Sequence, residues 1–377
     1  MSVLQNWLGV CKMVELLKIL TDHEGRYVAI EINNGLQTRV VPYEEVPRNQ
    51  LFNNAILCKN GVIRGKDGVK IPREVIIKDT TKISLRQFIN FMVYDGTMDK
   101  YGISYDNKYY IVKPREDLDD SSIFSEYVAS HFINNLGFEA HNTELVDTDE
   151  GMCVVIEDFM NSYGLLRPFS ETKQSSEGTN IENKGYTYED IQKLIRKHTK
   201  VPDEFKPEAL KSFWNMFFLD AILGNRDRHA GNWGYIVLGE ESEFYRIAPL
   251  YDNGASLFPS VIPKLGAYKR NKFKFLYERC EKFPACLIKD EGKRTNYYYF
   301  VNKKNLQRFD LMYEAYKRFK NIGVFAVKDA IVKAVNHPLI PDDLKEFYKN
   351  IVIMRYLHII DRVGEAELRR YFYGAVR

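Results

Sequence analysis

The spacing of apolar residues changes near residue 160 of this chain of 377 residues. Before that point, short runs rich in Val and Ile alternate with Gly, Asn and Pro, a pattern typical of β-strands. Beyond it, apolar residues recur at intervals of three and four over long segments, which is typical of amphipathic helices. A strand-rich half followed by a helix-rich half predicts an α+β fold with two lobes, and a cleft between lobes is a common place for a ligand.

The composition limits the classes of protein to consider. A chain of 377 residues that is 45% hydrophobic can bury a large core and is expected to form more than one domain. Its 54 Lys and Arg nearly balance its 51 Asp and Glu, so bulk charge does not argue for nucleic-acid binding. Five scattered cysteines without a CxxC pair indicate neither a disulfide framework nor a zinc site, and reduced thiols fit a cytoplasmic location. No run approaches 18 apolar residues, so we expect no membrane association.

Region 1–85 is predicted to form an N-terminal helix and a small, mostly β region. The helix is expected over residues 1–20, because Lys12, Glu15 and Lys18 interrupt an apolar segment that lacks the basic region and the cleavage site of a signal peptide. Short strands rich in Val and Ile are expected at 26–32, 37–43, 54–60 and 69–78.

Region 86–160 is predicted to form the strand-rich lobe, and region 161–377 the helical lobe. The elements expected around the first lobe are a helix at 84–93, a hairpin at 101–114, a helix at 121–138 and a strand pair at 143–148 and 151–159. The helical lobe begins with a polar stretch up to about residue 186, which predicts a flexible loop or linker. Its expected helices lie at 188–199, 207–223, 305–320, 324–335 and 342–360, with one strand pair at 233–238 and 244–250.

Two polar loops lie on either side of the strand pair predicted at 233–238 and 244–250. Asp227 is followed at five residues by Asn232, and Asp252 in "LYDNG" comes twenty residues after Asn232. In protein kinases, Asp-x-x-x-x-Asn on one loop and Asp-x-Gly after the next strand pair position the attacking hydroxyl and hold Mg²⁺. Asp and Asn are also ordinary turn residues, which is the alternative for either loop alone. Because both motifs occur in the right order, we predict that Asp227 is catalytic and that Asn232 and Asp252 bind the metal.

A lysine upstream completes this pattern. Lys113 lies in the predicted strand "YYIVKP", and Glu126 lies thirteen residues later in the helix that follows. A strand lysine held by a helix glutamate can neutralise the α- and β-phosphates of a nucleotide. The alternative is that both side chains face solvent, which is common for each of them.

Three weaker features surround these residues. The turn "DGTMDKYGI" offers backbone N–H groups to phosphates, but it has no GxGxxG and a plain hairpin turn is the alternative. The strand "VVIEDF" reaches the lobe boundary, where an adenine can bind backbone and stack on an aromatic ring; a simple strand end is the alternative. His229 forms no ligand-spaced cluster with the other histidines, so we expect it to orient its loop or to contact the nucleotide.

The segments "GNRDRHAGN" and "IAPLYDNGAS" together resemble the HipA-like family of bacterial serine/threonine kinases, the toxin kinases of toxin–antitoxin pairs. The resemblance covers about Tyr94 to Pro259. It implies a bilobal protein-kinase-like fold, with ATP and Mg²⁺ as cofactors and transfer of the γ-phosphate to a hydroxyl of a protein, autophosphorylation included. It also implies that Asp227 is the catalytic aspartate and that Asn232 and Asp252 are the magnesium ligands. Together, the motifs and the resemblance predict these nucleotide-binding residues: Asp95, Gly96, Thr97, Met98, Asp99, Lys100, Lys113, Glu126, Glu157, Asp158, Phe159, His229 and Tyr251.

The resemblance implies partners as well. The substrate would be a protein, with an aminoacyl-tRNA synthetase as one candidate, and a small helix-turn-helix antitoxin would be a candidate partner through which DNA is contacted indirectly. Val93 and Tyr94 stand where the best-known toxin of the family has an autophosphorylated serine, so its off-switch is not carried over. The segment 269–300 matches nothing familiar and leaves the substrate open. A small-molecule or lipid kinase and a catalytically silent binding module remain the alternatives.

Overall fold

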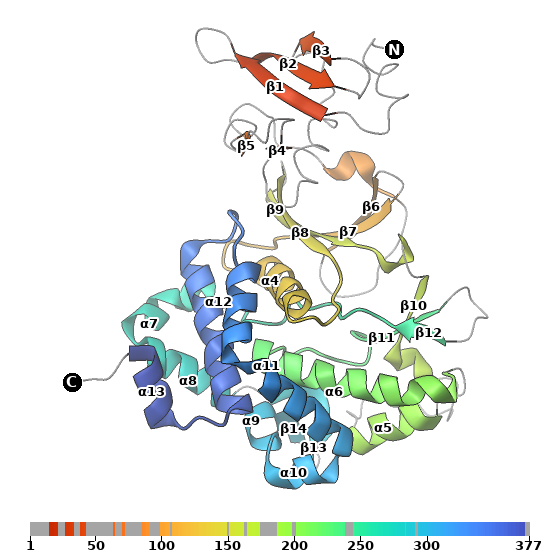
Figure 1. Ribbon diagram of the computed structural model, residues 1–377, viewed down its shortest axis with the longest axis vertical. Helices are drawn as coiled ribbons and strands as arrows, with labels where there is room; N and C mark the ends of the chain where they lie inside the picture. Colours follow the sequence, from red (N-terminus) through yellow and green to blue (C-terminus); the bar gives the residue numbers. More distant parts are fainter. Residues whose placement is uncertain are drawn as a thin grey trace. The chain divides into compact units, whose positions relative to one another are not determined.

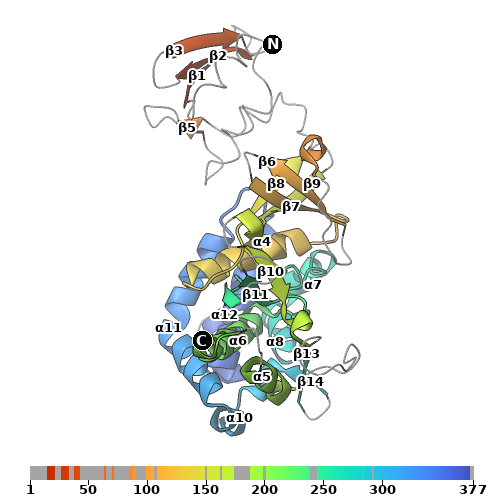
Figure 2. The same cartoon turned by 90° about the vertical axis from the view of Figure 1, so that its right-hand side faces the viewer.

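The computed structural model divides the chain into two compact units, each described here by itself (Figures 1 and 2). One unit comprises Met1–Gln87 with Val146–Gly151, and the other comprises Phe88–Leu145 with Met152–Arg377. The three predicted regions, 1–85, 86–160 and 161–377, stay a prediction. The structure describes residues 15–21, 27–33, 38–42, 63–64, 70–71, 85–90, 99–105, 108–148, 151–161, 164–173, 187–197, 201–237, 244–282, 284–290 and 293–373.

The described part of the first unit contains two antiparallel β-ladders. Three strands form a sheet in the order β1-β2-β3, and β4 pairs with β5. Their bounds are β1 (Glu15–Thr21), β2 (Tyr27–Asn33), β3 (Thr38–Pro42), β4 (Ile63–Arg64) and β5 (Lys70–Ile71). The strands predicted at 26–32 and 37–43 are confirmed by β2 and β3, whereas the one predicted at 54–60 lies outside the described residues.

The helix predicted for residues 1–20 is wrong over its described part, because residues 15–20 lie in β1. Ile19 of β1 is the register partner of Ile30 in β2, so hydrogen bonds across the sheet replace those within a helix. The apolar residues of this short segment fit either structure, and pairing with a neighbouring strand decides between them.

The helix predicted at 84–93 is also wrong in its length and type. In its described part, residues 85–90, a single 3₁₀ turn forms, η2 (Leu85–Phe88). Ile89 then makes an antiparallel bridge with Ile103, which places the chain beside a sheet instead of continuing the helix.

A four-stranded sheet has the order β6-β7-β9-β8. The predicted hairpin is formed by β6 (Tyr101–Tyr105) and β7 (Lys108–Pro114), and the predicted strand pair by β8 (Thr143–Thr148) and β9 (Gly151–Glu157). The helix between these pairs is α4 (Ser122–Asn135), also as predicted. Lys113 is the register partner of Val154 in this sheet.

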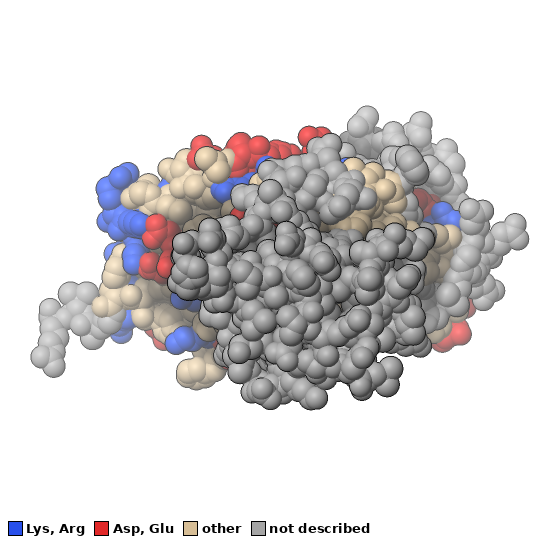
Figure 3. Space-filling view, turned by 90° about the horizontal axis from the view of Figure 1, so that it is seen from above, with Lys and Arg blue, Asp and Glu red and all other residues tan. Residues whose placement is uncertain are grey.

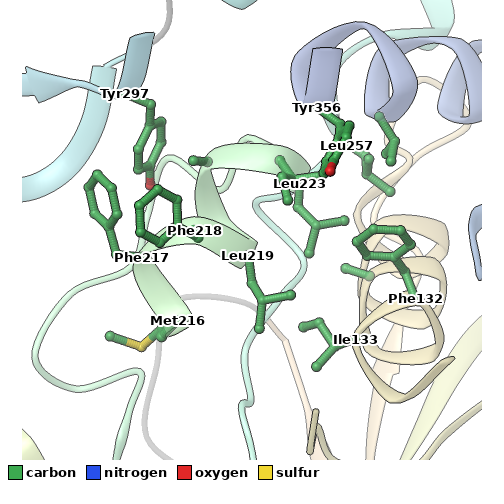
Figure 4. Close-up of a cluster of buried hydrophobic side chains, with 14 of the residues drawn as sticks. Phe132, Ile133, Met216, Phe217, Phe218, Leu219, Leu223, Leu257, Tyr297 and Tyr356 are labelled. Carbon is green, nitrogen blue, oxygen red and sulfur yellow. The ribbon is translucent and has the colours of Figure 1, made fainter. Parts of the chain in front are cut away.

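The helix α6 (Lys206–Leu223) forms the centre of the helical lobe. Every residue from Phe213 to Leu223 is buried, the polar Asn215 and Asp220 included, so this part of the helix lies in the core on all sides. Figure 4 shows Leu219 and Leu223 facing the side of α4 that carries Phe132 and Ile133. Because α6 is fixed on all sides, the polar loop that follows it starts from a rigid point.

The other elements of this lobe surround α6 (Figures 1 and 2). A three-stranded sheet has the order β10-β11-β12, and a two-stranded ladder joins β13 to β14. The strand bounds are β10 (Leu165–Pro168), β11 (Gly234–Val237), β12 (Phe244–Ile247), β13 (Pro284–Asp290) and β14 (Lys293–Asn296). The helices are α5 (Tyr188–Lys197), α7 (Leu265–Arg270), α8 (Lys272–Lys282), α9 (Tyr297–Phe300), α10 (Lys303–Arg308), α11 (Asp310–Ala334), α12 (Asp342–Arg355), the π-helix η7 (Tyr356–Ile360) and α13 (Glu365–Tyr373).

The strand β10 was not predicted. It lies in the stretch expected to be a loop or linker, where the four residues "LLRP" are surrounded by polar sequence. Leu166 pairs with Ile236 of β11, so the strand forms because a partner is present and not because of its own pattern.

The helices α11 and α12 pack against α4. Asn135 Nδ2 at the end of α4 donates to Ala330 O of α11 at 3.2 Å, and Ser125 Oγ lies 3.2 Å from the Tyr348 hydroxyl of α12. Phe138 stacks on Phe319 with 5.1 Å between ring centroids. The C-terminal helices therefore help to hold the helix that carries Glu126.

Within the described residues, no helix combines the length and the apolar character needed to cross a membrane.

Gly224 ends α6 in a left-handed conformation, with φ 69°. A Cβ on it would lie 1.3 Å from Arg355 Nη1, so the buried guanidinium occupies the space that a side chain would need. Gly224→Ala is expected to lower the free energy of unfolding by about 2–4 kcal/mol, from the backbone strain and the displaced arginine together. Gly137→Ala is the matched control, since Gly137 has φ 78° with nothing within 4 Å of its Cβ position. Urea unfolding should show a loss of only about 1 kcal/mol there; equal losses at both sites would contradict the packing argument.

Candidate active site

Lys113 of β7 reaches two carboxylates at once. Its Nζ lies 2.9 Å from Glu126 Oε2 of α4 and 2.9 Å from Asp252 Oδ1 in the loop after β12. Lys113 is 8% and Glu126 1% exposed, whereas the Asp252 side chain keeps 42% of its surface in solvent. The structure brings together three residues that the sequence predicts for one site, and it excludes the alternative in which Lys113 and Glu126 face solvent.

The surroundings hold both partners of this pair in their ionised forms. Burial opposes the charge of Lys113, but the carboxylates of Glu126 and Asp252 outweigh it and raise the pKa of the ammonium. Burial also disfavours the charge of Glu126, but Lys113 and His141 outweigh it and lower the pKa of the carboxyl. Lys113 is thus a permanent buried cation with one half-exposed partner, which suits it to meet an anionic ligand.

Glu126 accepts four hydrogen bonds. Besides Lys113, it receives His141 Nε2 at 2.9 Å and the backbone N–H groups of Asn253 and Gly254 at 2.6 and 3.1 Å. A Cβ on Gly254 would lie 3.2 Å from Glu126 Oε2, so a glycine lets this loop approach the carboxylate closely. The loop that carries Asp252 is therefore joined to α4 directly.

His141 is a residue that sequence analysis missed. Its backbone N–H donates to Leu250 O at 3.0 Å, and Ala140 forms a parallel β-bridge with Leu250, two residues before Asp252. His141 belongs to no motif, and only the fold places it between Glu126 and the segment leading to Asp252. No signal within the sequence marks it.

The loop after α6 is held by its own backbone and amides. Asp227 N–H donates to Asn225 Oδ1 at 2.9 Å, and Asp227 O accepts from His229 N–H at 2.9 Å and from Asn232 Nδ2 at 2.9 Å. His229 Nδ1 accepts from Gly231 N–H at 3.1 Å, which orients the imidazole within the loop. The loop leaves the Asp227 side chain exposed and keeps Asn232 buried.

Arg228 ties this loop to α6 and to the loop of Asp252. The guanidinium is 4% exposed and pairs with Asp220 of α6, with Nε 3.0 Å from Oδ2. Its Nη1 donates to Asn232 O at 2.7 Å and to Tyr251 O at 2.5 Å. Its Nη2 donates to Asn253 Oδ1 at 2.6 Å. One buried side chain thus holds both loops that carry the predicted metal ligands.

The segment from Asp252 to Phe258 contains three non-glycine residues with left-handed backbone. The φ angles are 54° at Asp252, 55° at Leu257 and 59° at Phe258. Such conformations cost free energy and persist only where the surroundings impose them, which is common at functional sites. Here the guanidinium groups of Arg279 and Arg355 both lie over the Phe258 ring, at 5.5 and 5.0 Å from its centroid.

The adenine contact predicted at 157–159 is partly occupied by the protein itself. Glu157 N–H donates to Asn142 O at 2.9 Å, and Asp158 N–H donates to Tyr109 O at 3.0 Å. Neither N–H can donate to a base while these bonds persist. Sequence analysis could not foresee this, because both acceptors come from distant segments.

Phe159 and Tyr251 bring two predicted nucleotide-binding residues together. Their rings form an edge-to-face pair with 5.6 Å between centroids. Tyr251 donates its hydroxyl to Gly231 O at 2.9 Å, and burial raises the pKa of the phenol, which therefore remains neutral. The pair links the end of β9 to the loop of Asp227.

The predicted phosphate-covering loop is described only at its end. Asp95, Gly96, Thr97 and Met98 lie outside the described residues, and Asp99 and Lys100 directly precede β6. Asp99 is exposed and Lys100 is half-buried. Their contact with a nucleotide stays a prediction.

The two predicted metal ligands have the chemistry that Mg²⁺ prefers. Asn232 uses Nδ2 to bind Asp227 O, which leaves Oδ1 as its ligand atom, and Asp252 offers a half-exposed carboxylate. Mg²⁺ prefers oxygen and is commonly held by one or two protein groups together with phosphate oxygens and water. The described residues include no cluster of three or more His, Cys, Asp and Glu side chains able to hold a metal by themselves.

A buried lysine–glutamate pair beside an Asp-x-Gly loop, in an α+β fold with a sheet lobe and a helical lobe, is the arrangement of a protein kinase. The model of the family described as the HipA-like C-terminal domain matches residues 82–294, more than half of the chain. The chain therefore belongs to the HipA-like family.

Individual relatives agree with this assignment. The serine/threonine-protein kinase CtkA of Helicobacter pylori is 30% identical over 280 residues, which cover 70% of this chain and 81% of that protein. The crystal structure of the H. pylori proinflammatory kinase CtkA has a TM-score of 0.58 at 28% identity, over 72% of this chain and 95% of that chain. A Shewanella oneidensis complex of HipA, HipB and operator DNA has a TM-score of 0.47 at 13% identity, over 95% of this chain and 99% of that chain, which is too distant to support an argument. The protein is a protein kinase.

Proposed function

We propose that this kinase uses ATP and Mg²⁺ to transfer the γ-phosphate to a serine or threonine hydroxyl of a protein target. The observation that carries the proposal is the position of Lys113, buried and 2.9 Å from both Glu126 and Asp252. A fixed cation beside a half-exposed carboxylate supports binding of a phosphate chain together with a divalent cation. The name of the H. pylori relative supports serine and threonine as acceptors.

In the proposed mechanism, the site residues divide into a proton acceptor, a phosphate-binding pair and two metal ligands. Asp227 accepts the proton of the target hydroxyl while the hydroxyl oxygen bonds to the γ-phosphorus and ADP leaves with the oxygen of the broken bond. Lys113 binds the phosphates and is kept in place by Glu126. Asn232 and Asp252 would hold Mg²⁺, which neutralises negative charge on the phosphates when it is bound. Positioning and charge, without a covalent intermediate, would supply most of the catalysis.

The adenine would bind beside Phe159 and Tyr251. Their edge-to-face pair offers an aromatic surface at the boundary between the lobes. His229, in the same loop as Asp227, and the residues Asp95 to Lys100 complete the proposed nucleotide site by family resemblance.

Lys113→Met is expected to abolish ATP-dependent stabilisation and to lower kcat/KM by about 10²–10³-fold, because a preorganised charge on the phosphates is lost. The change leaves Glu126 buried without its ammonium partner, so the free energy of unfolding should also fall by about 3 kcal/mol. Lys108→Met is the matched control, since Lys108 lies on the same strand and pairs with Glu157 at 3.0 Å, but half of its side chain is exposed. Thermal unfolding with and without ATP and Mg²⁺ measures the ATP-dependent stabilisation, and transfer of labelled phosphate measures kcat/KM. Equal ATP stabilisation in the two variants would contradict the proposed role of Lys113.

The target, the partner and the location are proposals that rest on family resemblance. They comprise a protein substrate such as an aminoacyl-tRNA synthetase, a small helix-turn-helix antitoxin that would provide indirect contact with DNA, and a cytoplasmic setting. Incubation of the protein with ATP and a cell lysate, followed by mapping of phosphosites, tests the target class. Phosphorylated metabolites or lipids in place of phosphorylated proteins would favour the small-molecule alternative.

The alternative that the chain is a catalytically silent module that binds nucleic acid directly has less support than the kinase proposal. In the view of Figure 3, Lys and Arg side chains at the left edge lie beside Asp and Glu side chains. The basic helices α7 and α8 likewise pair Lys269 with Asp343 and Lys272 with Glu346, both at 2.5 Å. Such pairs reduce the positive potential that a phosphate backbone would need.

A further inference from the structure

Asn253 occupies the middle position of the Asp-Asn-Gly loop and is fully buried, with 0% exposure. In protein kinases with Asp-Phe-Gly, this position holds a phenylalanine whose packing separates active from inactive forms. A buried asparagine is costly unless its polar groups are satisfied. The contacts of Asn253 therefore indicate what replaces the phenylalanine in this chain.

Asn253 bonds in two directions. Toward α4, its backbone N–H donates to Glu126 Oε1 at 2.6 Å and its Nδ2 donates to Ser130 Oγ at 3.1 Å. Toward the loop of Asp227, its Oδ1 accepts from Arg228 Nη2 at 2.6 Å. Glu126 and Ser130 lie one turn apart on α4, so Asn253 is hydrogen-bonded to one face of that helix at two positions.

Arg228 extends this connection to the helical lobe. Its guanidinium is anchored to Asp220 of α6 and to the carbonyl oxygens of Asn232 and Tyr251. A continuous buried chain of hydrogen bonds thus runs from α6 through Arg228 and Asn253 to Glu126. Moving Asn253 out of its site would break its three bonds to Glu126, Ser130 and Arg228 at once, and an apolar ring at this position could not make the two that use the side chain.

We propose that Asn253 is a positioning residue that locks α4 to the catalytic loop, so that the Lys113–Glu126 pair is assembled before any nucleotide binds. The inference rests on the proposed function, because it assigns to Asn253 the support of a nucleotide site. Its consequence is that activation by movement of α4 or by a flip of the Asp-x-Gly loop is not available to this kinase.

Hydrogen exchange of the α4 amides tests the proposed positioning role of Asn253 and does not depend on kinase activity. In the nucleotide-free protein, Asn253→Leu is expected to raise the exchange rates of α4 about tenfold, because local opening of the helix becomes easier. Addition of ATP and Mg²⁺ should change α4 little in the unmodified protein and should slow its exchange in the variant. Ser130→Ala removes only one of the three bonds and should give a smaller increase at α4; it carries the test if Asn253→Leu does not fold.

Asn305→Leu is the matched control. Asn305 is 5% exposed in the helical lobe, and its Nδ2 donates to Phe300 O at 3.0 Å, so the same substitution removes a buried amide far from Glu126 in sequence and outside the proposed site. It should lower the melting temperature without a selective effect on α4 or on kcat. The proposed positioning role of Asn253 is contradicted if the α4 amides exchange no faster in Asn253→Leu than in Asn305→Leu. Failure of the proposed function would look different, because ATP would then stabilise neither the unmodified protein nor any variant, while the nucleotide-free comparison would still decide the role of Asn253.

Discussion

Asp252→Asn is expected to lower kcat about a thousandfold and to remove the part of ATP affinity that depends on Mg²⁺. The loss corresponds to about 4 kcal/mol of transition-state stabilisation, because an amide oxygen is a poorer ligand for a hard cation than a carboxylate. Calorimetric titration of ATP with and without Mg²⁺ measures the affinity, and labelled phosphate transfer measures kcat.

The fold should tolerate this change. Asn adopts the left-handed backbone that Asp252 has at φ 54° as readily as Asp does, and Lys113 keeps Glu126 as a partner. Asp343→Asn is the matched control, because Asp343 also pairs with a lysine, Lys269, and its side chain is 49% exposed compared with 42% for Asp252. A Mg²⁺ effect on ATP binding that survives in Asp252→Asn would remove Asp252 from the metal site.

Asp227→Asn is expected to give a different result: phosphate transfer falls about 10²–10⁴-fold, while ATP binds with Mg²⁺ as in the unmodified protein. The variant retains the backbone bonds that hold the loop, from Asp227 N–H to Asn225 and from His229 and Asn232 to Asp227 O, because none of them uses the carboxylate. The change removes the carboxylate that we propose as the acceptor of the proton from the target hydroxyl.

Comparison of the two variants separates chemistry from binding. If Asp227 is the proton acceptor, calorimetry distinguishes Asp227→Asn from Asp252→Asn although both are inactive. Undiminished transfer to a protein target by a folded Asp227→Asn variant would rule out the proposed catalytic role. Loss of ATP binding in the same variant would move Asp227 from catalysis to the nucleotide site.

The parts of the fold that sequence predicted correctly have strong local signals. The hairpin around residues 106–107, the helix α4 that ends before Gly137, and the core helix α6 that ends at Gly224 each combine a clear apolar spacing with a turn or a glycine. The contact of Lys113 with Glu126 was also predictable, because a strand and the helix after it pack together in this fold class. The catalytic, metal and nucleotide roles stay predictions.

The errors occurred where a distant partner decides the outcome. β1 has apolar residues that fit a helix or a strand, and its pairing with β2 selects the strand. β10 is hidden in polar sequence and forms by pairing with β11. His141 shows the same limit at the site, because its contact with Glu126 depends on the bridge between Ala140 and Leu250, more than a hundred residues apart.

The packing of α11 and α12 on α4 has a practical consequence for work on fragments of this protein. The family model ends at residue 294, but Ala330 and Tyr348, which contact Asn135 and Ser125 of α4, lie beyond it. A fragment trimmed at that boundary would leave the Phe138 ring and the adjoining apolar face of α4 in water, and it would be expected to aggregate or to remain loosely packed. The segment that the family model matches is therefore shorter than the piece of this chain that we expect to be needed for an intact site.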